Sequence, residues 1–290
     1  MSKTTIGLII NSANITDGES ERFKIAAEKT ATDLVIFNAA EEINLEKIKK
    51  QADTCDIILN DDGDYISIEL AKTLEMLGHK VVELSETFYY IEDKWLQYLR
   101  CKEGGVPVPE TILLSTNIPS AKKELHEFGK FPVVLKRVEG CRGEFVDKAD
   151  DISGAVAVIN KFWEKGEDKF PILAQEFIDS DSYRVLTIAG EPIQTAVKKR
   201  SSWKATGGNA NRFWKFKIDD KLQKILDKSV KTNNIVFCGY DFAKKGDDWV
   251  LIEVNSVPSY KFFDCDYENI IEKVLTHLKK IAHSHHKTSR

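Results

Sequence analysis

The segment LIEVNSVPS, residues 251–259, carries an acid and an amide two positions apart within an apolar run. Side chains two positions apart on a strand point to the same side, so Glu253 and Asn255 would face the same way. Asp241 lies on the preceding predicted strand, and Gly246 marks a turn that would bring it opposite Glu253. Three such oxygen ligands suit Mg²⁺. A solvent-facing polar hairpin explains the same pattern, so both interpretations stay open.

A second group of residues has the composition of a phosphate site. VVLKRVEGCRGEFV, residues 133–146, places Lys136 near the end of a predicted strand and follows it with Gly140 and Gly143. Glycines let backbone N–H groups approach phosphate oxygens, and the lysine adds a positive charge. The segment AQEFID, residues 174–179, ends a predicted strand with Gln-Glu, which could hydrogen-bond an adenine ring. An ordinary hairpin turn and a plain strand edge account for both segments equally well.

Composition excludes several classes of protein. With 42 basic and 46 acidic residues the net charge is −4, which favours neither nucleic acid nor a membrane surface as a partner. The five cysteines form no CxxC pair and are odd in number, which indicates a reducing compartment. No stretch approaches the roughly 18–20 apolar residues of a membrane span. We expect a cytoplasmic protein.

The first ninety residues alternate short apolar runs with amphipathic segments. This alternation predicts a parallel sheet covered by helices, and so an N-terminal α/β domain over residues 1–90. The expected strands are 5–10, 34–38, 56–60 and 80–84, and the expected helices are 19–31, 43–52 and 65–78.

The pattern changes after residue 90, where strands begin to meet through turns. We expect helices at 92–105 and 151–165, strands at 131–138 and 170–178, hairpins around Gly190 and Gly246, and a final helix. We therefore divide the rest of the chain into a central subdomain (91–179), a C-terminal subdomain (180–282) and a flexible tail (283–290).

The order of these pieces resembles the ATP-grasp superfamily, and within it the RimK-type amino-acid ligases. The resemblance rests on Lys94 in EDKWLQYL, Lys136 in VVLK, the loop EGCRG, the linker QEFI, Arg184, Arg200, Asp241 and EVNSVP. It implies a mixed α/β and α+β chain with the ATP-grasp fold, in which an N-terminal parallel α/β domain precedes two subdomains that clamp ATP between their sheets.

The resemblance also implies roles for individual residues. Lys94, Lys136 and the loop glycines Gly140 and Gly143 would meet the phosphates of ATP. The adenine would lie on the linker formed by Gln175, Glu176, Phe177 and Ile178. Two Mg²⁺ ions, with Mn²⁺ as a second candidate, would be held by Asp241, Glu253 and Asn255. The catalytic cations near the transferred phosphoryl group and the substrate carboxylate would be Arg184, Arg200 and Lys204.

The reaction that the resemblance implies joins a carboxylate to an amine through an acylphosphate, with ATP converted to ADP and phosphate. The expected partners are small carboxylates and amines, a peptide or a carrier protein, and a second copy of the chain. A dipeptide or glutathione-type ligase and a non-catalytic ATP-binding regulatory protein remain alternatives. The sequence departs from the family pattern at Phe145, Lys204 and Ser259, near the place where the substrate would lie, so the substrate itself is not specified.

Overall fold

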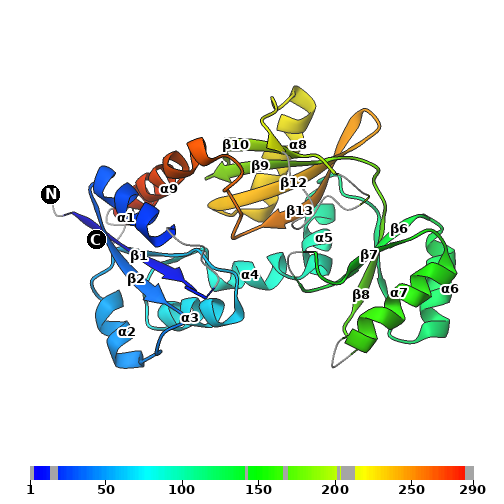
Figure 1. The fold of residues 1–290 in the computed structure, drawn as a ribbon, viewed down its shortest axis with the longest axis horizontal. Helices are drawn as coiled ribbons and strands as arrows, with labels where there is room; N and C mark the ends of the chain where they lie inside the picture. Colours follow the sequence, from blue (N-terminus) through cyan, green and yellow to red (C-terminus); the bar gives the residue numbers. More distant parts are fainter. Residues whose placement is uncertain are drawn as a thin grey trace.

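The computed structural model describes residues 3–13, 19–140, 143–165, 169–200, 203 and 213–284. Within them the chain forms three sheets, one from each successive third of the sequence (Figure 1). No helix in these ranges has an apolar stretch long enough to cross a bilayer.

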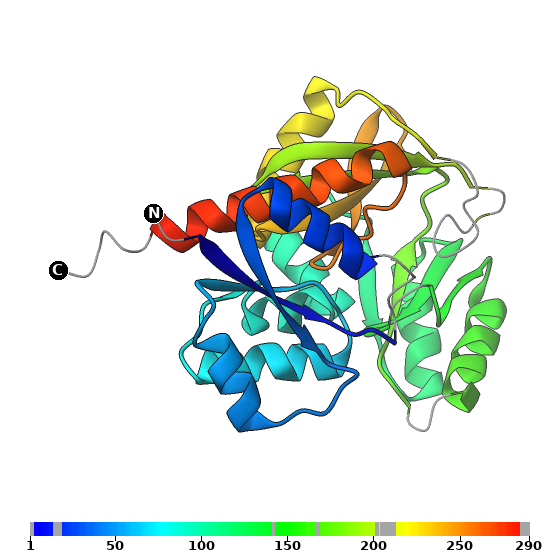
Figure 2. The ribbon, with the colours of Figure 1, turned by 60° about the vertical axis from the view of Figure 1, so that its left-hand side comes forward.

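The N-terminal sheet is parallel, as the alternation of strands and helices predicts. Its order is β2-β1-β3-β4, with β1 (Thr4–Ile10), β2 (Thr32–Asn38), β3 (Ile57–Asn60) and β4 (Val81–Val82). Its connecting helices are α1 (Glu19–Lys29), α2 (Leu45–Ala52) and α3 (Tyr65–Met76). The last helix, α9 (Asp264–Ser284), returns to this sheet and runs beside α1 (Figure 2).

The central sheet is antiparallel and has the order β5-β8-β6-β7. Its strands are β5 (Thr111–Leu114), β6 (Val133–Arg137), β7 (Val146–Ala149) and β8 (Ile172–Glu176). Two helices, α6 (Ile118–Phe128) and α7 (Ile152–Lys165), share a buried core with these strands (Figure 1). The other face of this sheet is therefore left for a ligand cleft.

The C-terminal sheet is also antiparallel, with the order β11-β10-β9-β12-β13. Its strands are β9 (Ser182–Ile188), β10 (Glu191–Lys198), β11 (Phe213–Trp214), β12 (Phe237–Lys245) and β13 (Asp248–Asn255). Two helices pack onto it, α5 (Lys94–Glu103) and α8 (Asp220–Asn233), and α4 (Ser85–Ile91) leads into α5 from the N-terminal sheet.

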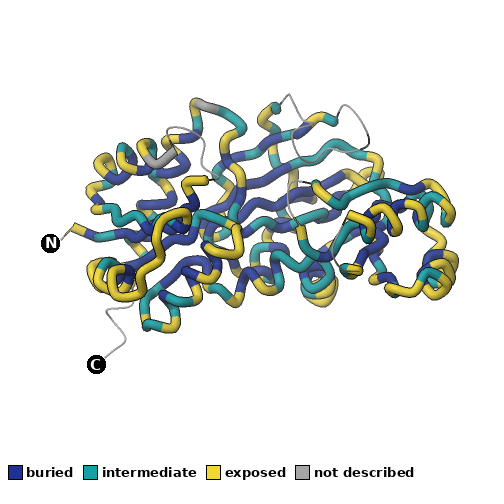
Figure 3. Tube along the Cα trace, turned by 60° about the horizontal axis from the view of Figure 1, so that its bottom comes forward, coloured by how far each residue is buried: buried dark blue, intermediate teal, exposed yellow. Residues whose placement is uncertain are grey.

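Buried residues lie on the strands and on the inner faces of the helices, and exposed ones lie on the loops and outer helix faces; Figure 3 marks both along the chain. Helices α6 and α8 were not expected from the sequence. Helix α9 extends to Ser284, so its end overlaps the first two residues of the predicted tail, whose last six residues lie outside the described ranges. Because α5 and α9 pack on sheets formed by other parts of the sequence, the subdomain boundaries 91–179 and 180–282 remain a proposal.

Candidate active site

A cleft that is partly open to solvent lies where α5, the central sheet and strand β13 meet. Four of its polar lining residues come from four separate elements of the chain: Lys94, Lys136, Gln175 and Glu253. Its apolar lining is supplied by Tyr98, Val108, Leu173, Leu251 and Ile252. An apolar wall with a few converging polar groups is the usual composition of a small-molecule site.

Lys94 is the first residue of α5, and Asp93 caps the helix by accepting hydrogen bonds from the N–H groups of Trp95 and Leu96 at 2.8 and 2.9 Å. A cation at a helix N-terminus is opposed by the helix dipole, so helix stability does not explain it. The ammonium of Lys94 donates to the carbonyl of Gly140 at 2.6 Å. Lys94 therefore contacts the glycine loop that the sequence assigns to phosphate.

Lys136 points from β6 into the same cleft, where its Nζ donates to Oε1 of Gln175 at 2.8 Å. The amide of Gln175 in turn donates to Oγ1 of Thr111 at 3.0 Å. Burial lowers the pKa of Lys136 to about 8, although the nearby Glu253 carboxylate opposes that shift. The protein thus holds a desolvated ammonium to which no described residue offers a carboxylate hydrogen bond, and this suits it to an incoming phosphate.

The register of the last hairpin pairs Asp241 directly with Glu253, as the turn at Gly246 predicts. A β-bulge follows, because Phe242 pairs with Leu251 and Ile252 is the extra residue. Bulges re-aim side chains and are common next to active sites. Here Ile252 and Glu253 both line the cleft although they are consecutive, which regular alternation would not allow.

Asp241 is buried and paired with two cations. Nε and Nη2 of Arg184 both donate to its carboxylate, the first at 2.8 Å, and Nζ of Lys198 lies 3.3 Å from Oδ1. Burial alone would raise the pKa of Asp241, but Arg184 and Lys198 outweigh that effect and hold it well below the ordinary range. Asp241 is therefore ionised, and both of its oxygens are occupied by protein donors.

Glu253 and Asn255 are half-buried and differ from Asp241 in their contacts. No described residue makes a hydrogen bond or ion pair with the Glu253 carboxylate, and the Nδ2 of Asn255 donates to the carbonyl of Gly239 at 3.4 Å, which leaves its Oδ1 as an acceptor. The described ranges contain no group of three His, Cys, Asp or Glu side chains placed to hold a metal. The donor set thus fits a hard cation through Glu253 and Asn255 completed by phosphates, whereas Asp241 would have to exchange its cations.

Arg200, a second predicted catalytic cation, does not join Arg184. Arg200 forms an ion pair with Asp179, and its N–H donates to Oδ1 of Asp181 at 3.1 Å, so its side chain lies against the loop that follows the linker. Lys204 lies outside the described residues. The catalytic roles of Arg200 and Lys204 stay predictions.

The linker Gln175–Ile178 leaves the central sheet and leads to β9. The N–H groups of Glu176 and Phe177 already donate to the carbonyls of Glu110 and Pro132, at 2.8 and 3.2 Å. The carboxylate of Glu176 pairs with Lys245 at 2.6 Å. An adenine would therefore have to meet other backbone groups of this linker, and its adenine role stays a prediction.

The predicted glycine loop connects β6 to β7, and Gly140 and Gly143 both have positive φ, at 132° and 73°. Residues with side chains rarely adopt these angles, which explains the glycines. Phe145 closes the loop at φ 48°, and the guanidinium of Arg137 lies 4.3 Å from the centre of its ring. The loop tip, residues 141–142, lies outside the described ranges.

Two charged residues of the site were not assigned to it from the sequence, although the basic stretch around Lys198 and Arg200 indicates an anionic substrate. Lys198 is buried on β10 beside Asp241, on the inward face that Gln194 and Ala196 also occupy, so a lysine at an inward position of an alternating strand is the signal. Glu92 lies 3.5 Å from Oγ of Ser256. Burial raises the pKa of Glu92, and Lys94 opposes that shift. No local pattern marks Glu92: it lies two residues before Lys94 in the sequence, and tertiary packing brings it to Ser256.

Comparisons with known proteins agree with this geometry. A model of the RimK-like ATP-grasp domain matches residues 91–278, which is more than half of the chain. A probable alpha-L-glutamate ligase of Legionella pneumophila (strain Corby) is 25% identical over 225 residues, which cover 75% of this chain and 73% of that protein. The alpha-aminoadipate–LysW ligase LysX of Sulfurisphaera tokodaii is 29% identical over 222 residues, which cover 71% and 74%.

Among solved structures, a protein of the same family has a similar fold. A RimK domain ATP-grasp protein of Sphaerobacter thermophilus superposes with a TM-score of 0.73 at 17% identity, over 95% of this chain and 99% of that one. The chain therefore belongs to the RimK-like ATP-grasp family, which binds ATP, and is a ligase of the class that forms C–N bonds.

Proposed function

We propose that this ligase activates the carboxylate of an amino acid or another small anion with ATP and joins it to an amine. The observation that carries the proposal is the meeting of Lys94, Lys136 and Glu253 in one cleft, although they lie on a helix and two strands far apart in the sequence. Two ammonium groups and an open carboxylate suit a triphosphate with its counter-ion.

The chemistry needs positioned charges and no protein nucleophile. A carboxylate oxygen of the substrate attacks the γ-phosphorus of ATP, the bond to the β,γ-bridging oxygen breaks, and ADP leaves. The amine then attacks the acyl carbon, phosphate departs, and the nitrogen loses a proton. Lys94 and Lys136 bind phosphate oxygens and offset the negative charge that moves during transfer.

We assign a divalent cation, Mg²⁺ in the cell, to Glu253 and Asn255, with Asp241 joining only if it gives up Arg184 and Lys198. The cation would neutralise phosphate charge. The support is the oxygen-only donor set and the absence of any hydrogen bond or ion pair from described residues to Glu253.

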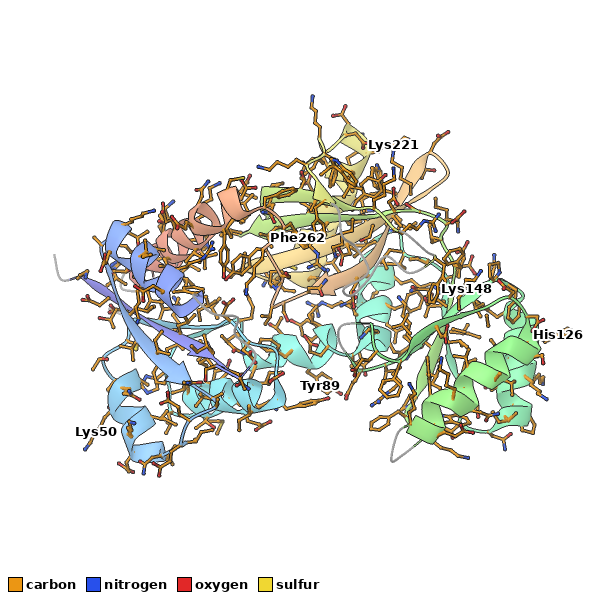
Figure 4. The ribbon with its side chains drawn as sticks, viewed as in Figure 1. Lys50, Tyr89, His126, Lys148, Lys221 and Phe262 are labelled. Atoms are coloured by element: carbon orange, nitrogen blue, oxygen red, sulfur yellow. The ribbon has the colours of Figure 1, made fainter. Side chains whose placement is uncertain are left out.

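An anionic carboxylate substrate is the class that two buried cations beside the proposed metal ligands favour. Arg184 and Lys198 share the carboxylate of Asp241 and lie 5.7 and 5.5 Å from the ring centre of Phe262, which Figure 4 labels beside the C-terminal sheet. The two relatives are named for joining glutamate and for joining alpha-aminoadipate to LysW. For this chain the amine acceptor is therefore proposed as a small amine, a peptide or a carrier protein. The four described cysteines are free thiols, which supports the cytoplasm as the compartment.

The test is phosphate release from ATP and Mg²⁺ with amino acids supplied singly and in pairs. We expect release only when an acidic amino acid and an amine are both present, with formation of the amide confirmed by mass spectrometry. Nucleotide binding without phosphate release under any pair, peptides included, would overturn the proposal in favour of a regulatory ATP-binding protein. Release with two neutral amino acids would favour the dipeptide-ligase alternative.

A further inference from the structure

Gln97 is a buried amide on α5 that makes three hydrogen bonds at the wall of the cleft. Its Nε2 donates to the carbonyl of Val254 at 2.9 Å and to the carbonyl of Ile91 at 3.1 Å, and its Oε1 accepts from the N–H of Val254 at 3.1 Å. Its side chain is only 6% exposed. The mechanism proposed above does not use it.

The contact with Val254 completes the edge of the C-terminal sheet. Strand β13 is the last strand in the sheet order, so one side of its backbone has no neighbouring strand. On that side Leu251 is satisfied by the carbonyl of Pro107 at 2.8 Å, and Val254 is satisfied by Gln97. A carboxamide presents an N–H donor and a carbonyl acceptor side by side, so it can satisfy the C=O and N–H of one strand residue, and its second N–H remains for Ile91.

The position of this contact links the two halves of the candidate site. Val254 lies between Glu253 and Asn255, the proposed metal ligands. On α5, Gln97 lies three residues after Lys94, which places the two side chains on the same face of the helix. A single amide therefore ties the backbone of the metal strand to the helix that carries the phosphate lysine.

We propose that Gln97 is a positioning residue for the divalent cation, because it holds Glu253 and Asn255 at a set distance from Lys94. This inference rests on the metal role proposed above. Ligands of a cation have to be held within roughly 0.5 Å of the productive geometry, and an edge strand without its partner would not meet that condition. The hydrogen bond to Ile91 fixes the end of α4 to the same amide.

The principal variant is Gln97→Met, which keeps the length and bulk of the side chain and removes both hydrogen-bonding groups. In the protein without ligands, hydrogen exchange of the Val254 amide should become at least tenfold faster, while amides in β9 change little. With a non-hydrolysable ATP analogue bound, the affinity for Mn²⁺, followed by its electron paramagnetic resonance signal, should fall at least tenfold. The affinity for the analogue in EDTA should stay within about threefold, because Lys94 and Lys136 remain.

Asn233→Leu is the matched control. Asn233 is another fully buried amide against α5, whose Nδ2 donates to the carbonyl of Ser229 at 2.8 Å and contacts Sγ of Cys101, away from β13. The Asn233→Leu variant should have a lower melting temperature, with unchanged hydrogen exchange of the Val254 amide and unchanged Mn²⁺ affinity. If Asn233→Leu lost as much Mn²⁺ affinity as Gln97→Met, the effect of Gln97 would be one of general stability, and the proposal would be overturned.

The outcomes separate this inference from the proposed function. If wild-type protein with the analogue binds no Mn²⁺, the proposed metal role fails and the inference fails with it. If wild type binds Mn²⁺ and Gln97→Met binds it equally tightly, only the inference fails. Gln97→Glu serves if the first variant does not fold, because it keeps the acceptor for Val254 and should show a smaller loss. In the wild-type protein, fast hydrogen exchange of the Val254 amide would show that Gln97 does not hold this strand, and the proposal would be overturned.

Discussion

Arg184 and Asp241 face each other on neighbouring strands β9 and β12, and the guanidinium of Arg184 donates to both carboxylate oxygens. On its other side Asp241 pairs in register with Glu253. No described residue makes a hydrogen bond or ion pair with the Glu253 carboxylate. Two carboxylates on adjacent strands thus have opposite surroundings, one neutralised inside the protein and one open to the cleft. They should respond to substitution in opposite ways.

Asp241→Asn should destabilise the fold. The amide would leave Arg184 and Lys198 buried without a counter-charge, and breaking such a pair from one side typically costs about 3–5 kcal/mol. Urea unfolding at neutral pH measures the loss. Asp179→Asn is the control, because Asp179 pairs with Arg200 but its side chain is 77% exposed, and exposed pairs contribute about 1 kcal/mol or less. Equal losses in the two variants would contradict the buried ion-pair account.

Glu253→Gln should leave the stability of the fold nearly unchanged and lower turnover instead. The substitution keeps size and strand geometry and removes no hydrogen bond or ion pair with a described residue, so the free energy of unfolding should stay within about 0.5 kcal/mol of wild type. Turnover should fall by about a hundredfold or more, in line with the roughly 3 kcal/mol lost with one preorganised electrostatic group. The gain in melting temperature from Mg²⁺ and ATP together should also shrink. Full turnover together with a full thermal shift would rule out a metal role for Glu253.

ATP affinity should depend on pH through Lys136. Burial lowers the pKa of this lysine to about 8, so above that pH the free protein must take up a proton before the ammonium can meet a phosphate. Affinity should therefore be flat between pH 6.5 and 7.5 and fall above pH 8 by up to about tenfold per unit. Calorimetric titration in buffers of different ionisation enthalpy would detect the proton uptake. Lys136→Met should bind more weakly and lose this pH dependence, and an unchanged slope would assign it to another group.

Stability should depend on pH through Glu83, which joins the N-terminal sheet to the C-terminal sheet. Its Oε1 accepts from the N–H groups of Val236 and Phe237 at 2.9 and 3.0 Å, and its side chain is buried. Burial raises its pKa from 4.5 to about 7, so between these values the folded state holds a proton that the unfolded state has lost. Stability should therefore fall as pH rises from 4.5 to 7, by up to about 3 kcal/mol.

Glu83→Gln checks this directly, because the amide keeps the acceptor oxygen and cannot ionise. The difference in unfolding free energy between Glu83→Gln and wild type should be small at pH 5 and grow toward pH 8 in favour of the variant. A difference that does not change with pH would mean that Glu83 keeps its ordinary pKa in the folded protein.

Local pattern was enough to predict most of the strands and the hairpin that carries Asp241 and Glu253. Alternation of apolar and polar residues reflects the two faces of a strand, and Gly246, at φ 63°, permits the turn between them. The same reasoning identified the loop of Gly140 and Gly143, since their backbone angles require glycine. Helices α6 and α8 were missed although both carry local signals: they begin at the capping residues Asn117 and Asp219, and their buried residues recur every three to four positions.

The sequence by itself determined which chemical groups are present: lysines beside a glycine loop, and oxygen ligands spaced along a hairpin. Only the tertiary structure decided how those groups are paired. In the folded protein Lys198 and Arg184 pair with Asp241, whereas no described residue pairs with Glu253. Arg200 pairs with Asp179, and Gln97 hydrogen-bonds to Val254. The reason is physical. Spacing along a strand depends on the local backbone, whereas the partner of a buried charge depends on which distant strand or helix packs against it, and that is settled by the whole core.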